Sequence, residues 1–265
     1  MKIVTQVSDL VSGCAFVPTM GALHSGHQSL FTLAAKKSES VMASIFVNPL
    51  QFENPDDLAR YPRTPEQDAE LAEEAGVTHL WLPLYEDIYP PGFKKLSAGP
   101  LGDIYEGASR PGHFDGVVTV VSRLFELVRP QFAIFGEKDF QQLSLIRKIK
   151  SDVEIVSAPT VRESDGLAMS SRNRFLNVAE RTTAPMLYQI IKDVARKIAA
   201  EAPITQVLAE GEARLTAAGF APDYLALVAA ETLEPLAQTT TAPMRLLAAA
   251  RLGSVRLLDN MGVSA

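Results

Sequence analysis

The apolar positions of this chain alternate between short continuous runs and segments with helical spacing. The continuous runs, typical of strands covered on both faces, are residues 14–18, 41–47, 77–82, 132–135 and 153–156. The segments with helical spacing are residues 28–38, 65–75, 116–129 and 141–150. Strands that alternate with helices predict an α/β fold with a parallel sheet.

The pattern changes near Thr160. A polar, arginine-rich segment at residues 160–176 is followed by runs of a different order. Helical stretches are predicted at residues 180–201 and 204–218, and strand-like runs at 224–229, 244–250 and 254–259. Helices followed by strands indicate a smaller α+β domain. We therefore expect two domains, residues 1–160 and residues 161–265.

Composition and charge exclude several classes of protein. The 265 residues carry a net charge of −6, with 47% apolar and 21% charged residues, an ordinary globular balance. An acidic chain lacks the basic face needed for non-specific binding to nucleic acid or anionic membranes. No apolar stretch approaches the ~18 residues of a membrane span, and the first residues do not resemble a signal peptide. The single cysteine, Cys14, excludes an internal disulfide and is expected to pack in the core. We expect a cytoplasmic protein that binds neither nucleic acid nor membrane.

Two common nucleotide-binding fingerprints are absent. No G-x-G-x-x-G follows the first predicted strand, and no G-x-x-x-x-G-K-[ST] occurs. If the chain binds a nucleotide, it must do so through a different motif.

The first candidate site is the segment PTMGALHSGH, residues 18–27, between the first strand and the first helix. His24 and His27 are three positions apart, so they share one face of a helix that begins here. Ligands of parallel sheets bind at the carboxyl ends of the strands, and a helix N-terminus favours anions. The segment indicates a phosphate site; an ordinary glycine-rich turn and a metal-binding histidine pair are the alternatives.

Four further segments carry side chains suited to an anionic or polar ligand. They are FVNPLQF at 46–52, RPGHFDG at 110–116, FGEKDFQQ at 135–142 and MSSR at 169–172. Lysine, arginine and serine donate to phosphate oxygens, and the glutamine amide both donates and accepts. Taken singly, each segment is equally consistent with a turn, a connection, a solvated lysine or a helix cap.

Together and in this order, these segments resemble the pantothenate synthetase family, the pantoate–β-alanine ligases. The resemblance runs nearly continuously over residues 16–176, includes YPRT at 61–64, and returns more weakly in RLLDN at 256–260. The HSGH element is also similar to the H-x-G-H of the wider nucleotidyltransferase superfamily. The resemblance implies a Rossmann-like parallel-sheet domain followed by a smaller C-terminal α+β lid domain.

The resemblance also implies a two-step reaction. Pantoate attacks the α-phosphate of ATP to give pantoyl adenylate and pyrophosphate, and the amine of β-alanine then gives pantothenate and AMP. ATP is expected as a substrate together with Mg2+. The expected partners are pantoate, β-alanine, ATP and a second copy of the chain in a homodimer.

Residue roles are carried over motif by motif. His24, His27 and Lys138 are expected to be catalytic, Gln51 and Gln142 to bind pantoate, and Gln51 also to border the β-alanine site. The residues expected to bind ATP are Met20, Gly21, Ala22, Leu23, His24, Ser25, Gly26, His27, Gly136, Glu137, Lys138, Asp139, Val161, Met169, Ser170, Ser171 and Arg172. Val161 is expected to contact adenine through its backbone, and residues 169–172 to close on the phosphates.

The chain departs from the family pattern at three places. The stretch before Pro18 is short, and so is the link between Lys150 and Val153. Gln67 precedes Asp68 where the family often has neighbouring carboxylates, which leaves the magnesium ligands open.

Two other functions remain as alternatives. The first is a different nucleotidyltransferase, which would not need both Gln51 and Gln142. The second is an inactive ATP-binding scaffold, which would not need the intact histidine, lysine and serine–arginine motifs. His79, which stands alone before an apolar pair, is expected to be structural.

Overall fold

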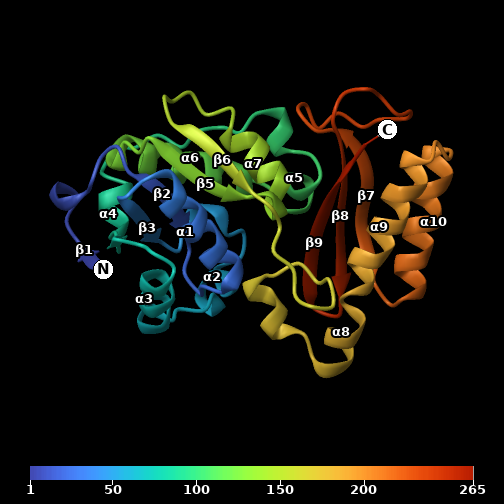
Figure 1. Cartoon of the computed structure of the whole chain (residues 1–265), viewed down its shortest axis with the longest axis horizontal. Helices are drawn as coiled ribbons and strands as arrows, with labels where there is room; N and C mark the ends of the chain where they lie inside the picture. Colours follow the sequence, from blue (N-terminus) through green and yellow to red (C-terminus); the bar gives the residue numbers. More distant parts are fainter. Residues whose placement is uncertain (265) are drawn as a thin grey trace. The chain divides into compact units, whose positions relative to one another are not determined.

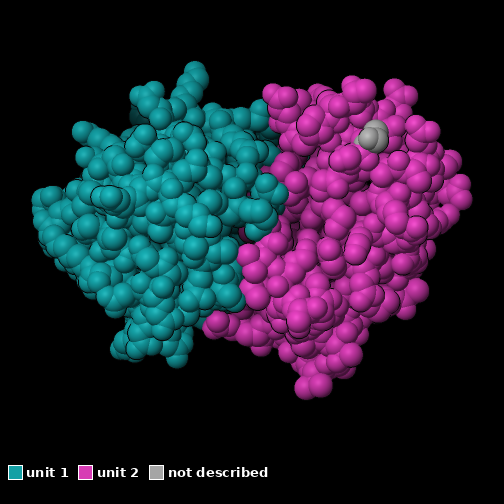
Figure 2. All heavy atoms as spheres, viewed as in Figure 1, with its two compact units in different colours: residues 1–137, 141–159 teal, residues 138–140, 160–265 magenta. Residues whose placement is uncertain are grey.

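The computed structural model describes residues 1–264 and divides them into two compact units, coloured separately in Figure 2. Unit 1 consists of residues 1–137 and 141–159, and unit 2 of residues 138–140 and the chain from Thr160 onward. Each unit has a hydrophobic core of its own.

Unit 1 is built on a six-stranded parallel sheet in the order β1–β4–β3–β2–β5–β6. The strands are β1 (Lys2–Val4), β2 (Ala15–Thr19), β3 (Val41–Ile45), β4 (His79–Trp81), β5 (Phe132–Gly136) and β6 (Glu154–Ala158). Five of them lie where the apolar runs predicted strands. The sequence did not predict β1, because this short strand buries only Val4 and so leaves little apolar signal.

The helices of unit 1 connect these strands (Figure 1). They are α1 (Ser25–Lys37), α2 (Pro55–Arg60), α3 (Pro65–Glu74), α4 (Tyr85–Ile88), α5 (Glu106–Ser109), α6 (His113–Val128) and α7 (Phe140–Ile146). Pro65 stands at the first turn of α3, where its missing N–H is tolerated. The helix predicted over residues 141–150 ends earlier, at Ile146, and turns follow it.

The central strand β2 pairs differently on its two sides. All of Ala15–Thr19 pairs with β3, whereas pairing with β5 stops after Phe16. Main-chain groups of alternate residues point to the same side, and the Cys14 carbonyl accepts the N–H of Phe132, the first residue of β5. Pro18 therefore faces β5 with no N–H to donate, and the β2–β5 ladder ends. This carboxyl edge, where the strand order reverses, is the usual ligand position in such sheets.

Unit 2 combines a three-stranded antiparallel sheet, in the order β7–β8–β9, with three helices. The elements are α8 (Val178–Thr183), α9 (Met186–Ala199), α10 (Ile204–Ala217), β7 (Ala221–Ala229), β8 (Met244–Leu252) and β9 (Val255–Val263). Buried residues of α9 recur at helical spacing, and they share a core with residues of the sheet. The single helix predicted over 180–201 is wrong: two helices meet at Pro185, which has no N–H to continue the first.

The predicted fold class is confirmed by this topology: a parallel α/β sheet followed by a smaller α+β unit. No helix within residues 1–264 is both long and apolar enough to cross a lipid bilayer.

Candidate active site

Three predicted segments follow three neighbouring strands of unit 1. The strands are β3, β2 and β5, which are adjacent in the sheet and parallel, so their carboxyl ends share one edge. The segment at 18–27 follows β2, Gln51 follows β3, and Gln142 follows β5. The sheet thus places the starts of all three segments at its carboxyl edge, with Gln142 in the first turn of α7.

Two histidines form the N-terminal cap of α1. The Nδ1 of His24 accepts the Gly26 N–H at 3.1 Å, and the Nδ1 of His27 accepts the His24 N–H at 3.3 Å. The two ring centroids lie 4.1 Å apart. A neutral imidazole that accepts at Nδ1 carries its proton on Nε2. The cap therefore sets the tautomer of both rings and makes each Nε2 a donor, next to a helix N-terminus that favours anions. The predicted helix entry is confirmed; Ser25 begins α1.

The loop between β2 and α1 is held by a buried carboxylate. Asp68 of α3 is 1% exposed, and its oxygens accept the N–H groups of Ala22 at 3.0 Å and Leu23 at 2.7 Å. Thr64 Oγ1 donates to the same carboxylate at 3.0 Å. Gly21 and Ala22 have φ angles of 80° and 51°, which lie in the left-handed region. Asp68 thus supports a loop conformation that costs energy at Ala22.

The sequence left the magnesium ligands around Asp68 open. Both of its oxygens accept hydrogen bonds from the protein, and Gln67 is exposed. Within residues 1–264, no three histidine, cysteine or acidic side chains are grouped to hold a metal ion. Mg2+ usually keeps several waters and is bound through substrate phosphates. Asp68 is thus engaged in holding the loop, and magnesium ligands are not identified among the described residues.

Gln51 closes the short helix η2 (Pro49–Gln51), and its amide is oriented by Asn48. Gln51 is 8% exposed, and its Oε1 accepts from Asn48 Nδ2 at 2.9 Å. The hydroxyl of Tyr89 donates to Asn48 Oδ1 at 2.7 Å, and burial raises the pKa of Tyr89 far above its usual value, so the hydroxyl stays protonated. The Gln51 Nε2 lies 3.0 Å from Sδ of Met20. Nε2 donates one N–H to this sulfur, so the second N–H of the amide is the donor left for a ligand.

The loop at 110–116 supports the main chain at Gln51. The Nδ1 of His113 donates to the Gln51 carbonyl at 2.8 Å, since that oxygen can only accept, and Arg110 Nη2 lies 3.3 Å from the same oxygen. A Cβ on Gly116 would approach the Leu50 carbonyl oxygen to 2.3 Å, so glycine is required. The sequence alone offered no firm physical case for this loop.

Two adjacent glutamines after β5 have different roles. Gln141 is buried; its Nε2 donates to the carbonyls of Leu101 and Ile104, each at 2.8 Å, and its Oε1 accepts the Glu106 N–H at 3.0 Å. Gln142 is half-buried, and its side chain makes no hydrogen bond within residues 1–264. Gln141 is therefore structural, and Gln142 is the one whose amide is available to a ligand.

The Gly136–Asp139 segment is divided between the units. Gly136 ends β5, and Glu137 is the last residue of this part of unit 1. Lys138 and Asp139 complete the short helix η4 (Glu137–Asp139) and belong to unit 2. Lys138 Nζ lies 3.5 Å from Asp139 Oδ1.

Val161 and Met169 pair at the ends of a hairpin in unit 2. The Met169 N–H donates to the Val161 carbonyl at 3.0 Å, and Arg162 bridges to Ala168 between them. The Val161 carbonyl thus accepts one hydrogen bond within the hairpin and keeps a second lone pair.

The hydroxyl of Ser170 caps the short helix η5 (Ser171–Phe175). Its Oγ accepts the Arg172 N–H at 3.3 Å, which is the helix cap that the sequence held as an alternative. The hydroxyl proton is not used in that bond, so a cap and a ligand contact are compatible.

A small cavity in unit 2 brings together three predicted phosphate contacts: Lys138, Ser170 and Arg172. Its volume is about 10 Å³, roughly enough for one water. The Oδ1 of Asn173, another lining residue, is buried without a hydrogen-bond partner among the described residues. Lys138 therefore lies beside Ser170, Arg172 and Asn173 in unit 2.

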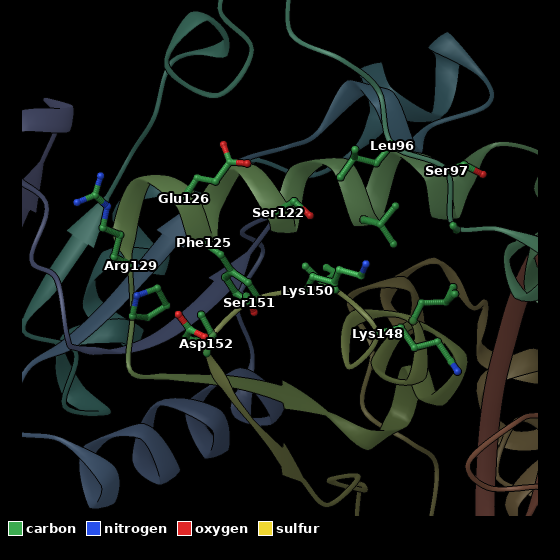
Figure 3. A pocket seen from close by; sticks show the side chains of 16 residues that line it. Leu96, Ser97, Ser122, Phe125, Glu126, Arg129, Lys148, Lys150, Ser151 and Asp152 are labelled. Carbon is green, nitrogen blue, oxygen red and sulfur yellow. The ribbon is translucent and has the colours of Figure 1, made fainter.

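A larger cavity of about 750 Å³ lies elsewhere in unit 1 (Figure 3). Ser122 and Phe125 of α6 line one part of it, and Lys148, Lys150 and Asp152 line another. None of the predicted site residues lines this cavity, so its size does not make it the candidate site.

Comparison with known sequences gives consistent matches. The family model described as pantoate–beta-alanine ligase matches residues 2–262. A curated pantothenate synthetase of Rhizorhabdus wittichii is 47% identical over 99% of this chain and 99% of its own. That of Acidiphilium cryptum is 51% identical over 94% of this chain and 91% of its own.

Solved structures show the same similarity. A pantothenate synthetase of Thermus thermophilus superposes with a TM-score of 0.92 at 45% identity, over 100% of both chains. A pantoate–beta-alanine ligase of Francisella tularensis, complexed with beta-gamma ATP and beta-alanine, has a TM-score of 0.81 at 33% identity. That match covers 98% of this chain and 97% of the other.

Proposed function

The chain belongs to the pantoate–β-alanine ligase family of enzymes, and from that premise we propose that it uses ATP to join pantoate to β-alanine through a pantoyl adenylate. The observation that carries the proposal is the pair of imidazoles, His24 and His27, at the N-terminus of α1, each of which accepts a main-chain N–H at Nδ1. The Francisella relative, bound to an ATP analogue and β-alanine, supports two of the three substrates.

In the first step a carboxylate oxygen of pantoate forms a bond to the α-phosphorus of ATP. The bond from that phosphorus to the bridging oxygen breaks, and pyrophosphate leaves. Charge grows on the oxygens of the five-coordinate phosphorus. His24 and His27 donate to those oxygens as the charge develops, and the α1 N-terminus adds its dipole. These interactions strengthen in the transition state, so they increase the rate rather than only the affinity.

Lys138 and the 169–172 segment neutralise the phosphates that leave. Lysine is a compact cation, and arginine donates two parallel hydrogen bonds to phosphate. Ser170 and Ser171 add hydroxyl donors, and Met169 takes part in shielding the adenylate from water, which would hydrolyse it. Mg2+ would be held by the phosphates of ATP and by water, and it would offset their negative charge. The main chain of Val161 binds adenine.

The glutamine amides bind pantoate without adding charge. Gln51 donates through the second N–H of Nε2, because Asn48 and Met20 orient its amide. Gln142 donates or accepts with an amide that no described residue engages. Neutral donors orient the carboxylate without a full positive charge that would blunt its nucleophilicity.

In the second step the β-alanine amine attacks the acyl carbon of the adenylate. The C–N bond forms, the bond from that carbon to the AMP oxygen breaks, and the amine releases a proton. Gln51 borders the site of this amino acid. The family resemblance is also the basis for proposing a homodimer in the cytoplasm.

Isotope transfer tests the adenylate directly. With 18O in the carboxylate of pantoate, the proposed route carries one labelled oxygen into AMP, because the acyl–oxygen bond is the one that breaks in the second step. Mass spectrometry of AMP after a complete reaction reads out the label. Unlabelled AMP accompanied by pantothenate would contradict the intermediate.

A further inference from the structure

A side chain of strand β9 is hydrogen-bonded to the short segment that carries Lys138. The Asn260 Nδ2 donates to the Lys138 carbonyl at 2.8 Å, across 122 positions of the chain. The Asn260 Oδ1 accepts from Arg245 Nε at 2.7 Å, and the Arg245 guanidinium lies 4.3 Å from the ring centre of Phe140. Residues 138 and 140 are thus both tied to the unit 2 sheet.

The neighbouring residue, Asp259, forms an ion pair with the hairpin that precedes the second proposed phosphate-binding segment, residues 170–172. Its carboxylate makes a bidentate pair with Arg162, at 2.6 and 2.8 Å. Arg162 also donates to the Gly166 carbonyl at 3.1 Å, and its guanidinium lies 3.9 Å from the ring centre of Tyr188. Arg162 belongs to the 161–169 hairpin, which leads directly into Ser170 and Arg172. One carboxylate therefore fixes the base of that segment.

Adjacent positions on β9 serve these two segments. Neighbouring side chains of a strand point to opposite faces, so Asp259 and Asn260 reach different parts of the chain. Both are 4% exposed. A buried ion pair is weak evidence for stability, because apolar residues of the same size often stabilise as well or better. Stability alone therefore does not explain why β9 buries two polar residues, Asp259 and Asn260. Holding the Lys138 segment and the 161–169 hairpin in fixed positions does explain it.

Resting on the proposed function, we infer that Asp259 and Asn260 are positioning residues for ATP. They anchor Lys138 and the 170–172 segment to one strand. The ammonium of Lys138, the serine hydroxyls and the guanidinium of Arg172 therefore keep fixed positions relative to one another when they bind the phosphates. This gives the RLLDN ending a role in ATP use, exerted through residues that lie more than 80 positions earlier in the chain.

A double-mutant cycle between Asn260→Asp and Lys138→Ala tests this. Asn260→Asp keeps the shape and the acceptor for Arg245 but loses the donor to the Lys138 carbonyl. Lys138→Ala removes the ammonium and keeps that carbonyl. Alone, Asn260→Asp should lower kcat/KM for ATP by about 10- to 100-fold, since misplacing a binding group by about 1 Å costs that much. In the Lys138→Ala background it should change kcat/KM by less than about twofold, because coupled sites are not additive.

Val263→Ala is the matched control for stability. Val263 is a core residue of the same strand and has no part in the contacts to Lys138. If Asn260→Asp lowers kcat/KM no more than Val263→Ala does, or if its loss is undiminished in the Lys138→Ala background, Asn260 is merely structural and the inference is overturned.

A second cycle addresses Asp259 in the same way. Asp259→Asn, combined with Arg172→Ala, should be non-additive in kcat/KM for ATP. Asp193→Asn, which weakens the ion pair of α9 with Arg214 on α10, serves as the control. Additive losses from Asp259→Asn would overturn its positioning role.

ATP affinity, measured by calorimetry without pantoate, provides an independent readout of both cycles. A wild-type chain that binds ATP but does not react with pantoate contradicts the proposed function, and the affinity cycles then decide the inference. A wild-type chain that reacts while the cycles are additive contradicts the inference alone.

Discussion

The backbone N–H of Leu23 donates to the Asp68 carboxylate at 2.7 Å, across 45 positions of the chain. The Ala22 N–H, at 3.0 Å, makes the matching bond to the other oxygen. A side chain of α3 thus sets the conformation of the loop that leads to His24 and His27. Asp68 therefore acts as a positioning residue: its carboxylate holds the main chain of the loop and does not itself contact the reacting atoms in the proposed mechanism.

Asp68→Asn should lower the adenylation rate and the stability together. An amide has one oxygen, so one of the two loop N–H groups faces an NH2 group and loses its acceptor. We expect about 1–3 kcal/mol of lost unfolding free energy and about 10- to 100-fold in rate. Denaturant unfolding and pyrophosphate exchange measure the two effects.

Asp87→Asn is the control for this change. Asp87 Oδ2 also accepts a backbone N–H, from Leu84 at 2.7 Å, at the start of α4. The Asp87→Asn substitution should lower the free energy of unfolding somewhat and leave the adenylation rate within about twofold of the wild-type value. Equal rate losses in the two variants would show that the carboxylate of Asp68 does not act through the loop.

His27→Ala should reduce the rate of adenylation far more than the affinity for ATP. The Nε2 donor of His27 gains strength as charge grows on the α-phosphate, and losing such a donor costs roughly 10²–10³ in rate. Single-turnover adenylation and ATP titration separate the two quantities. His79→Ala is the comparison, because it removes an imidazole of β4 that is hydrogen-bonded to the Thr78 hydroxyl. Equal losses of rate and affinity in His27→Ala would refute a role specific to the transition state.

Gln142→Ala and Gln141→Ala should differ sharply. Gln142 makes no side-chain hydrogen bond within residues 1–264, so its loss should raise the KM for pantoate while the unfolding free energy and the KM for β-alanine stay nearly unchanged. Gln141→Ala leaves two carbonyls and one N–H without their partner and should destabilise by about 1–3 kcal/mol. Steady-state kinetics with each substrate varied in turn measure the first effect, and thermal unfolding the second. A selective defect toward β-alanine in Gln142→Ala would place that residue in the other pocket.

Cys14 should make stability fall at alkaline pH. Burial raises the pKa of this thiol from 9.0 to about 11, and its side chain is fully buried. Because the folded pKa is the higher one, the native state keeps its proton longer than the unfolded chain. The stabilisation that the protonated Cys14 gives the folded state is complete below pH 9. It is lost as the pH rises through about 11, and over this range the free energy of unfolding falls by up to about 1.4 kcal/mol per pH unit.

Denaturant unfolding at several pH values checks this, with Cys14→Ala as the reference. The slope between pH 9 and 11 should be shallower in the variant. The native thiol should also resist iodoacetamide at pH 8 until the protein unfolds. Rapid alkylation of the folded chain would contradict the burial.

Much of the fold could be predicted because the signals were local. Nearly continuous apolar runs predicted five of the six parallel strands, and the histidine pair marked the entry of α1. The errors have local causes as well: β1 buries a single residue, and Pro185 divides the stretch that was predicted as one helix.

The supporting contacts of the site could not be predicted in the same way. Asp68 to the 22–23 amides, His113 to the Gln51 carbonyl and Asn260 to the Lys138 carbonyl join residues 45 to 122 positions apart. Side chain to backbone bonds of this kind leave no periodic pattern in the sequence. The two adjacent glutamines illustrate the limit, since only the fold shows that Gln141 is engaged and Gln142 is not.

Pyrophosphate exchange into ATP is the most direct measurement of the central claim. Labelled pyrophosphate should enter ATP only when pantoate is present with magnesium, and no β-alanine should be needed, because the first step is reversible and complete in itself. Pantothenate formation without such exchange, or exchange that proceeds equally well without pantoate, would contradict a pantoyl adenylate formed at the His24–His27 site.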